Sequence, residues 1–224
     1  MNTIATKPKT EGTKMLQVMG GLGALCALLI VLTYEGTAPR IAQLKEEALQ
    51  QAVFSVLPGT QSTQEFYLSD QSFGTTPVEN STLIFAGYDA DGELIGVAIE
   101  ASGRGYADII KVLYGYDPIN EQITGFYVLE SKETPGLGDK IEKDAAFQSN
   151  FSAMDVALDA DGSAIKHPVS TVKHGEKTAS WQIDGITGAT ISSRAIGSML
   201  DASTAKWLPV IQKNLNTLQT TPAP

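Results

Sequence analysis

The stretch Asp-Gly-Ile-Thr-Gly-Ala-Thr-Ile-Ser at residues 184–192 is the most informative part of the chain. An amphipathic run begins inside it and continues at helical spacing to Trp207, with Ser192 or Ser193 as a suitable N-cap. Gly188 allows a positive φ or the close approach of another molecule. An anion held beside this turn would lie near a helix N-terminus, where free N–H groups favour it. Taken alone, the stretch fits equally well an ordinary small-residue turn before a serine-capped helix.

A second segment, Glu-Ser-Lys-Glu-Thr-Pro-Gly-Leu-Gly-Asp-Lys-Ile-Glu-Lys at residues 130–143, contains a strong turn signal. Pro135 fixes φ at one position, and Gly136 permits a positive φ at the next. Gly136 and Gly138 leave backbone exposed to the approach of a flat ring, and Leu137 between them offers an apolar contact. Taken alone, the segment is better explained as a tight loop between a strand over 123–129 and a helix starting near residue 139.

Together the two segments resemble known families. Residues 184–192 resemble the flavin-attachment signature of the FMN-binding domain family. Residues 130–143 are similar to a signature of the G subunit of Rnf electron-transport complexes, and also to the C subunit of the sodium-translocating NADH:quinone reductase. Gly-Arg-Gly-Tyr at 103–106 and the run from 109 to 129 resemble the same families. The resemblance covers roughly residues 85–200, together with an apolar N-terminal segment.

The resemblance implies a covalent cofactor. In the FMN-binding family a flavin transferase joins the FMN phosphate to the hydroxyl after Gly-Ala, which here is Thr190. The expected residues of the attachment motif are Asp184, Thr187, Gly188, Ala189, Thr190 and Ser192. The loop expected to contact the isoalloxazine ring comprises Glu133, Thr134, Pro135, Gly136, Leu137 and Gly138. Within that loop, Glu133 and Thr134 are expected to hydrogen-bond the ring edges, which is how a protein orients a flavin and adjusts its potential.

The N-terminal segment predicts a membrane anchor. Residues 15–34 carry no charged side chain, and twenty such residues can cross a bilayer core of about 30 Å. Lys7, Lys9 and Lys14 precede the span, so the positive-inside tendency places the N-terminus in the cytoplasm. The prediction is a single-pass protein of the bacterial inner membrane with its C-terminal domain on the periplasmic side. The alternative is a cleaved signal peptide, but residues 36–38 form a poor cleavage site.

Composition and motifs exclude several other classes. The net charge of −9 argues against non-specific nucleic-acid binding, which needs a basic surface. The Asp-Ala-Asp-Gly sequences at 89–92 and 159–162 lack the further ligands of a calcium loop and are predicted to be turns. His167 and His174 have no spacing partner and are expected to be structural or solvent-facing, so no metal site is predicted. Cys26 is the single cysteine, which excludes an intrachain disulfide.

Hydrophobic patterning predicts an α+β fold: a single domain with a mixed or antiparallel sheet and packed helices, preceded by one transmembrane helix. Strands are expected over 83–88, 93–101, 109–116, 122–129, 155–158, 169–171 and 179–184, with helices over 39–57, 139–151 and 192–207, the last ended by Pro209. The predicted segments are a cytoplasmic tail (1–14), a transmembrane helix (15–34), a juxtamembrane helix and strap (35–80), the FMN-binding domain (81–212) and a C-terminal tail (213–224).

The leading functional expectation, implied by the resemblance, is an electron-transfer subunit of an Rnf-type complex. Its expected partners are the other membrane subunits of that complex and a flavin transferase for maturation. One alternative is a membrane-anchored FMN carrier or flavin sensor of another redox pathway. Others are the C subunit of the quinone reductase and a non-redox scaffold that merely keeps the fold.

Overall fold

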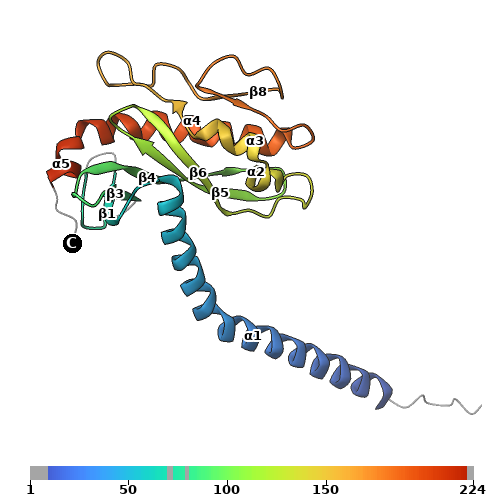
Figure 1. The fold of residues 1–224 in the computed structure, drawn as a ribbon. Helices are drawn as coiled ribbons and strands as arrows, with labels where there is room; N and C mark the ends of the chain where they lie inside the picture. Colours follow the sequence, from blue (N-terminus) through green and yellow to red (C-terminus); the bar gives the residue numbers. More distant parts are fainter. Residues whose placement is uncertain (1–9, 70–72, 79–80, 221–224) are drawn as a thin grey trace, which may run out of the picture. The chain divides into compact units, whose positions relative to one another are not determined.

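The computed structural model of the chain describes residues 10–69, 73–78 and 81–220. The chain divides into two compact units, residues 1–47 and residues 48–224, and its first helix, α1 (Thr10–Val56), contributes to both (Figure 1). The predicted helix over 39–57 is therefore part of one helix that begins before the apolar span.

The first unit is the N-terminal part of α1. Its most apolar window has a mean hydropathy of 2.3, and none of that window is buried within the structure. An apolar helix of this length is a candidate for a membrane span, although a signal sequence near an N-terminus meets the same criteria. Residues 10–14 were predicted to belong to a polar tail, but they are helical, because a helix that has formed extends at little cost. Residues 1–9 of that tail lie outside the described residues.

The second unit is built on a seven-stranded antiparallel sheet with the strand order β2-β1-β3-β4-β5-β6-β7. Its strands are β1 (Ser62–Leu68), β2 (Phe73–Gly74), β3 (Thr82–Tyr88), β4 (Leu94–Arg104), β5 (Ile109–Asp117), β6 (Gln122–Glu130) and β7 (Met154–Asp155). The predicted strands over 83–88, 93–101, 109–116 and 122–129 are confirmed as β3 to β6. The strap expected in the later part of residues 35–80 is wrong where β1 and β2 form, because β1 pairs with β3 along its whole length and buries Phe66 and Leu68.

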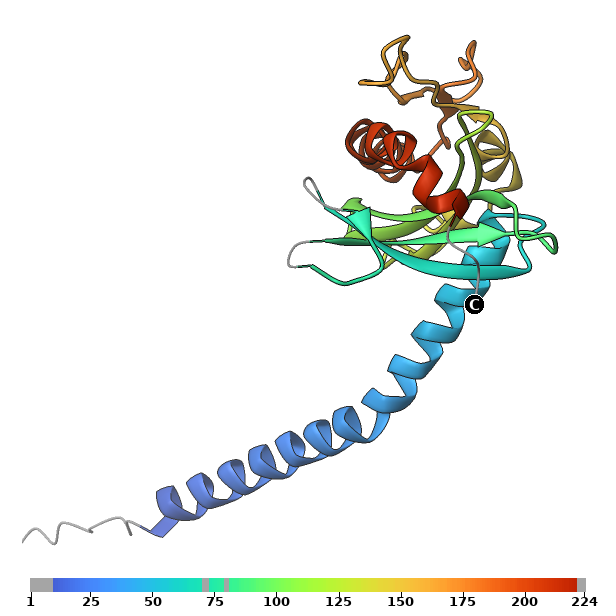
Figure 2. The ribbon, with the colours of Figure 1, turned by 90° about the vertical axis from the view of Figure 1, so that its left-hand side faces the viewer.

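One face of the sheet carries the main hydrophobic core. Helix α4 (Thr190–Lys213) packs against β4 on this face, and its opposite side packs against β8 (Ser170–Val172), which pairs in parallel with β9 (Gln182–Asp184) (Figures 1 and 2). The helix buries Ile196, Leu200 and Trp207 in this core. Burial of each such side chain stabilises the fold by roughly 1.5–3 kcal/mol. The α+β prediction is confirmed, with α4 as the main helix on the sheet.

The opposite face of the sheet is covered by the last turns of α1. Ala52, Val53, Val56 and Leu57 form a second buried cluster there with residues of β3, β4 and β5. The Thr124 hydroxyl of β6 donates a hydrogen bond of 2.8 Å to the carbonyl of Val56, one of the carbonyls that a helix C-terminus leaves unpaired. The end of α1 is therefore an integral part of the folded domain.

The helices differ from prediction in three places. Instead of one helix over 139–151, the chain forms α2 (Lys140–Lys143), α3 (Ala145–Gln148) and a 3₁₀ turn, η1 (Ser149–Phe151), because the Asp144 side chain caps a new helix start. Helix α4 starts at Thr190 with Ala189 as its N-cap, so neither predicted serine caps it. It also continues through Pro209, whose burial in the core offsets the hydrogen bond that proline cannot donate.

The predicted C-terminal tail is largely ordered. Helix α5 (Leu215–Thr220) buries Leu218 completely, and the Tyr88 hydroxyl of β3 donates a hydrogen bond of 2.8 Å to the Leu218 carbonyl. The expected tail over 213–224 is therefore wrong as far as residue 220, since an apolar anchor and a buried tyrosine hold this segment on the domain. Residues 221–224 lie outside the described part of the chain.

Candidate functional site

The turn that precedes α4 leads directly to an exposed hydroxyl, that of Thr190. Gly188 has a φ of +86°, a conformation that L side chains rarely adopt, and a Cβ added to it would meet nothing within 4 Å. The chain then passes through buried Ala189 and enters α4 at Thr190, whose side chain is exposed. The first N–H groups of a helix have no partner within it, so Thr190 stands where an attached anion would be stabilised.

The other hydroxyls of this segment differ in their availability. Ser192 is 2% exposed and Ser193 is fully buried. The Ser193 hydroxyl donates to the Ala189 carbonyl and accepts from the Ile186 N–H, so it closes the turn from within. Thr187 is exposed like Thr190, but it lies before the turn rather than on the helix. Solvent exposure therefore leaves the hydroxyls of Thr187 and Thr190 as the candidate acceptors of an FMN phosphate.

The second motif forms a compact loop before α2. The Leu137 N–H donates a hydrogen bond of 3.1 Å to the Thr134 carbonyl, and Gly136 has a φ of +78°, as the Pro-Gly turn signal predicts. Leu137 at the tip of the loop is 51% exposed, although it is a large apolar side chain. The loop thus offers an apolar surface on a short and well-defined turn.

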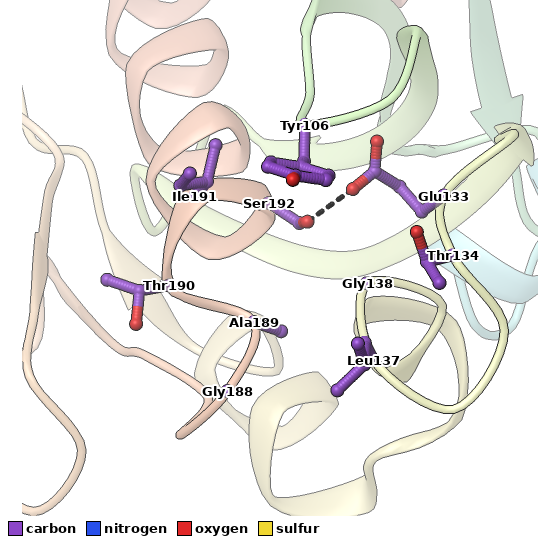
Figure 3. A pocket seen from close by; sticks show the side chains of 10 residues that line it. All are labelled: Tyr106, Glu133, Thr134, Leu137, Gly138, Gly188, Ala189, Thr190, Ile191 and Ser192. Carbon is purple, nitrogen blue, oxygen red and sulfur yellow. Dashed lines mark hydrogen bonds between the residues drawn. The ribbon is translucent and has the colours of Figure 1, made fainter.

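The two motifs meet at one cavity of about 330 Å³ (Figure 3). Glu133, Thr134, Leu137 and Gly138 line it from the loop, and residues 188–192 line it from the start of α4. Tyr106, from the connection between β4 and β5, completes the lining. Segments that lie about fifty residues apart in the sequence are therefore brought to one site.

Glu133 lies at the junction of the three segments. One carboxylate oxygen, Oε2, accepts a hydrogen bond from the Ser192 hydroxyl, shown dashed in Figure 3, and the other, Oε1, accepts from the Ala107 N–H at 2.9 Å. Burial on its own raises the pKa of Glu133. The hydrogen bonds from Ser192 and from backbone N–H groups of residues 106–108 outweigh burial, and the pKa is lowered below its ordinary value. The side chain is therefore a buried carboxylate that is ionised near neutral pH.

Some predicted site residues lie outside this cavity. Asp184 and Thr187 line a second, smaller hollow of about 170 Å³. There the Asp184 carboxylate accepts a 2.7 Å hydrogen bond from the Gly175 N–H and lies 3.3 Å from Nδ1 of His174, so it holds a neighbouring turn. Pro135 and Gly136 shape the loop without lining the main cavity.

Two residues of the cavity were missing from the predicted site. Tyr106 is 67% exposed. The sequence signal for it is the Gly-Arg-Gly-Tyr stretch at 103–106, which resembles the same families but does not by itself assign the tyrosine a role in the site. Ile191 directly precedes the predicted helix over 192–207, where the amphipathic run begins, but it is exposed on the first turn of α4. An apolar residue at the very start of an amphipathic helix need not follow the buried stripe, and periodicity gives no warning of this.

All the residues that line the cavity fall within a segment that matches a known domain family. Residues 105–204 match the FMN-binding domain family. The G subunit of the ion-translocating oxidoreductase complex of Methanosarcina acetivorans is 31% identical over 193 residues, which cover 86% of this chain and 93% of that protein. The G subunit of the Na(+)-translocating ferredoxin:NAD(+) oxidoreductase complex of Acetobacterium woodii is 28% identical over 188 residues, which cover 81% of this chain and 84% of that protein.

Solved structures share the fold. The crystal structure of Shewanella oneidensis NqrC superposes with a TM-score of 0.61 at 19% identity, and the match covers 80% of this chain and all of that one. The C subunit of the Na(+)-translocating NADH-quinone reductase of Parabacteroides distasonis gives a TM-score of 0.58 at 20% identity, covering 79% of this chain and 94% of that one. At such identities the similarity establishes the architecture alone.

Proposed function

The chain belongs to the family of G subunits of ion-translocating oxidoreductase complexes of the Rnf type, and we propose that it transfers electrons there through an FMN attached covalently to Thr190. The observation that carries the proposal is the cavity at which the 133–138 loop and the start of α4 meet. Of the two exposed hydroxyls near the turn, Thr190 is the one that lines this cavity.

The residues present fit a flavin. The cavity of about 330 Å³ lies at the low end of the ~300–1,000 Å³ that is usual for cofactor sites. Leu137 and Tyr106 are large, exposed and able to cover a flat ring, while the open space beside Gly188 leaves room for a bulky group. The exposed hydroxyl of Thr190 stands at a helix N-terminus, which suits a phosphodiester. Bound FMN supplies the reversible uptake and release of electrons.

Attachment is a phosphoryl transfer to Thr190. The bond between the threonine Oγ1 and the FMN phosphorus forms, and the phosphoanhydride bond of a flavin dinucleotide donor breaks. The other nucleotide leaves as a monophosphate, and the hydroxyl proton is released. We propose that a flavin transferase catalyses this step, because the cavity side chains supply no base beside Thr190: Glu133 is already hydrogen-bonded to Ser192 and Ala107. The remaining membrane subunits of the complex are the proposed electron-transfer partners.

The alternatives have less support. A C subunit of the quinone reductase would share the fold, as the structural similarity to NqrC illustrates, but the relatives that match most of this chain at about 30% identity are G subunits. A flavin carrier or sensor of another pathway would use the same cavity and would differ in its partners.

Covalent flavin is expected after the full chain is co-expressed with a flavin transferase. The intact mass should rise by one FMN less one water, and a denaturing gel should show a fluorescent band, because a phosphoester survives unfolding. Expression without the transferase is the control and should give the unmodified mass. A non-fluorescent, unmodified chain under both conditions would favour the scaffold alternative over the proposed function.

The proposed orientation puts residues 35–224 on the periplasmic side of the bacterial inner membrane, since Lys7, Lys9 and Lys14 precede the apolar span. A phosphatase that is active only in the periplasm should be active when fused after Pro224. A fluorescent protein that matures only in the cytoplasm should stay dark at the same position. The reverse pair of results would place the domain, and any flavin on it, on the cytoplasmic side.

A further inference from the structure

We infer that Glu133 is a positioning residue: its carboxylate fastens the Tyr106 turn to the first turn of α4 and so fixes the two walls of the cavity. This differs from the expectation that Glu133 hydrogen-bonds the flavin ring. The inference rests on the proposed function, because it assigns a role in the attachment and environment of the flavin.

The hydrogen bonds of Glu133 leave neither carboxylate oxygen without a protein donor. Oε1 accepts from the Ala107 N–H at 2.9 Å, and Oε2 accepts from the Ser192 hydroxyl at 2.5 Å. The residue is only 6% exposed although it lines the cavity. Hydrogen bonds to an ionised group are about twice as strong as those between neutral groups, so the carboxylate is a firm link between its two partners.

Two glycines of the sequence motifs are explained by this link. A Cβ at Gly105 would lie 2.5 Å from Oε1 of Glu133, and a Cβ at Gly138 would lie 2.6 Å from Oε2. Real Cβ atoms do not approach other atoms so closely. A Cβ at Gly105 would also lie 2.6 Å from Cδ1 of Ile110, and one at Gly138 would lie 2.8 Å from Cβ of Glu133, so glycine at both positions lets the backbone close over the Glu133 side chain. The Gly105 N–H in turn donates to the Asp108 carbonyl at 2.9 Å, which closes the turn that carries Tyr106.

The partners of the carboxylate are neighbours of the residues that a flavin would contact. Ala107 directly follows Tyr106, and Ser192 lies two residues after Thr190. Because the Ser192 hydroxyl donates its hydrogen to Glu133 inside the protein, it is also unavailable as a competing acceptor for the FMN phosphate. One buried side chain therefore sets the position of the Tyr106 wall, the orientation of the first turn of α4 and the choice of acceptor.

The test is a double-mutant cycle in the full chain with Glu133→Gln, Ser192→Ala and the double variant. The two readouts are the initial rate of FMN attachment by flavin transferase and the visible circular dichroism of the attached flavin, which a loss of global stability alone would not move. Each single variant is expected to slow attachment by about tenfold, the factor that corresponds to one charge-assisted hydrogen bond, and to alter the flavin spectrum. The double variant should be no worse than the more severe single variant, because the two side chains act as a unit.

Ser203→Ala is the matched control. Ser203 also lies on α4 and its hydroxyl is 2.8 Å from the Tyr114 hydroxyl, but it does not line the cavity. This variant should keep the attachment rate and the flavin spectrum of the unsubstituted chain. Should Glu133→Gln fail to fold, the comparison of Ser192→Ala with Ser203→Ala decides the question alone.

The outcomes separate the inference from the proposed function. If the unsubstituted chain acquires no FMN, the proposed function fails. If it acquires FMN and Ser192→Ala changes neither rate nor spectrum, Glu133 does not act through Ser192 and the inference is overturned. Multiplicative effects in the double variant would overturn it as well, since they would show that the two residues act separately.

Discussion

Thr190→Val is expected to abolish covalent flavin completely. Valine keeps the β-branched shape of threonine but replaces the hydroxyl by a methyl group, and a phosphoester cannot form without the oxygen. The substitution is on the exposed first residue of α4, so the fold should be retained. After co-expression with a flavin transferase, the variant should show the unmodified mass and no fluorescent band on a denaturing gel.

Thr187→Val is the matched control for that experiment. It makes the same chemical change on another exposed threonine three residues away, which lines the smaller hollow instead of the main cavity. This variant keeps the Thr190 hydroxyl, so the FMN that it carries should map to Thr190, whatever the loss of one residue of the attachment motif does to the yield. An adduct that persists in Thr190→Val, or that is lost in Thr187→Val and mapped by peptide mass to Thr187, would contradict the assignment of the acceptor.

The strands and the site motifs could be predicted because their signals are local. Apolar patterning, together with the Asp-Ala-Asp-Gly turn at 89–92, predicted β3 to β6, and the Pro135-Gly136 pair predicted the loop before α2. The two family signatures predicted most of the residues that line the cavity. In each of these cases, the residues whose pattern is recognisable in the sequence are the same residues whose conformational or packing preferences form the element.

The parts that could not be predicted depend on partners distant in sequence. Strand β1 is polar over its first half and shows no clear alternation of apolar residues, so its extended conformation depends on its pairing with β3. Helix α4 passes Pro209 because burial at that point offsets a missing hydrogen bond, which propensity alone does not anticipate. The hydrogen-bond partners of the Glu133 carboxylate within the protein come from residues 107 and 192, and no local pattern could reveal them.

The glycines of the sheet show the same dependence on long-range packing. Gly87, Gly96, Gly115 and Gly125 lie on four adjacent strands, where glycine has a low intrinsic preference. A Cβ at any of them would come closer than 3.0 Å to another group, and at all four an atom of residue 56 or 57, where α1 ends, is among the nearest. The four glycines therefore leave the room on this face of the sheet that lets the C-terminal end of α1 pack closely against it.

Gly115→Ala is accordingly expected to destabilise the domain by about 3 kcal/mol, the upper part of the usual range for overpacking. The new Cβ would collide with the Val56 carbonyl oxygen and lie 2.7 Å from the Thr124 hydroxyl, which donates to that same carbonyl. The Val56 backbone cannot yield as the far end of a flexible side chain would. Thermal unfolding of the full chain in detergent micelles, followed by near-ultraviolet circular dichroism, should show a melting temperature lower by roughly 6–12 °C.

Gly74→Ala serves as the comparison, because Gly74 also lies in a strand but a Cβ there meets nothing within 4 Å. That variant should stay within about 0.5 kcal/mol of the unsubstituted chain. Equal melting of both variants would mean that the last turns of α1 do not rest on the sheet, and that the domain begins after them. A large difference would mean that the helix which leads from the apolar span ends as part of the domain core, since its final carbonyls and side chains are what the alanine displaces.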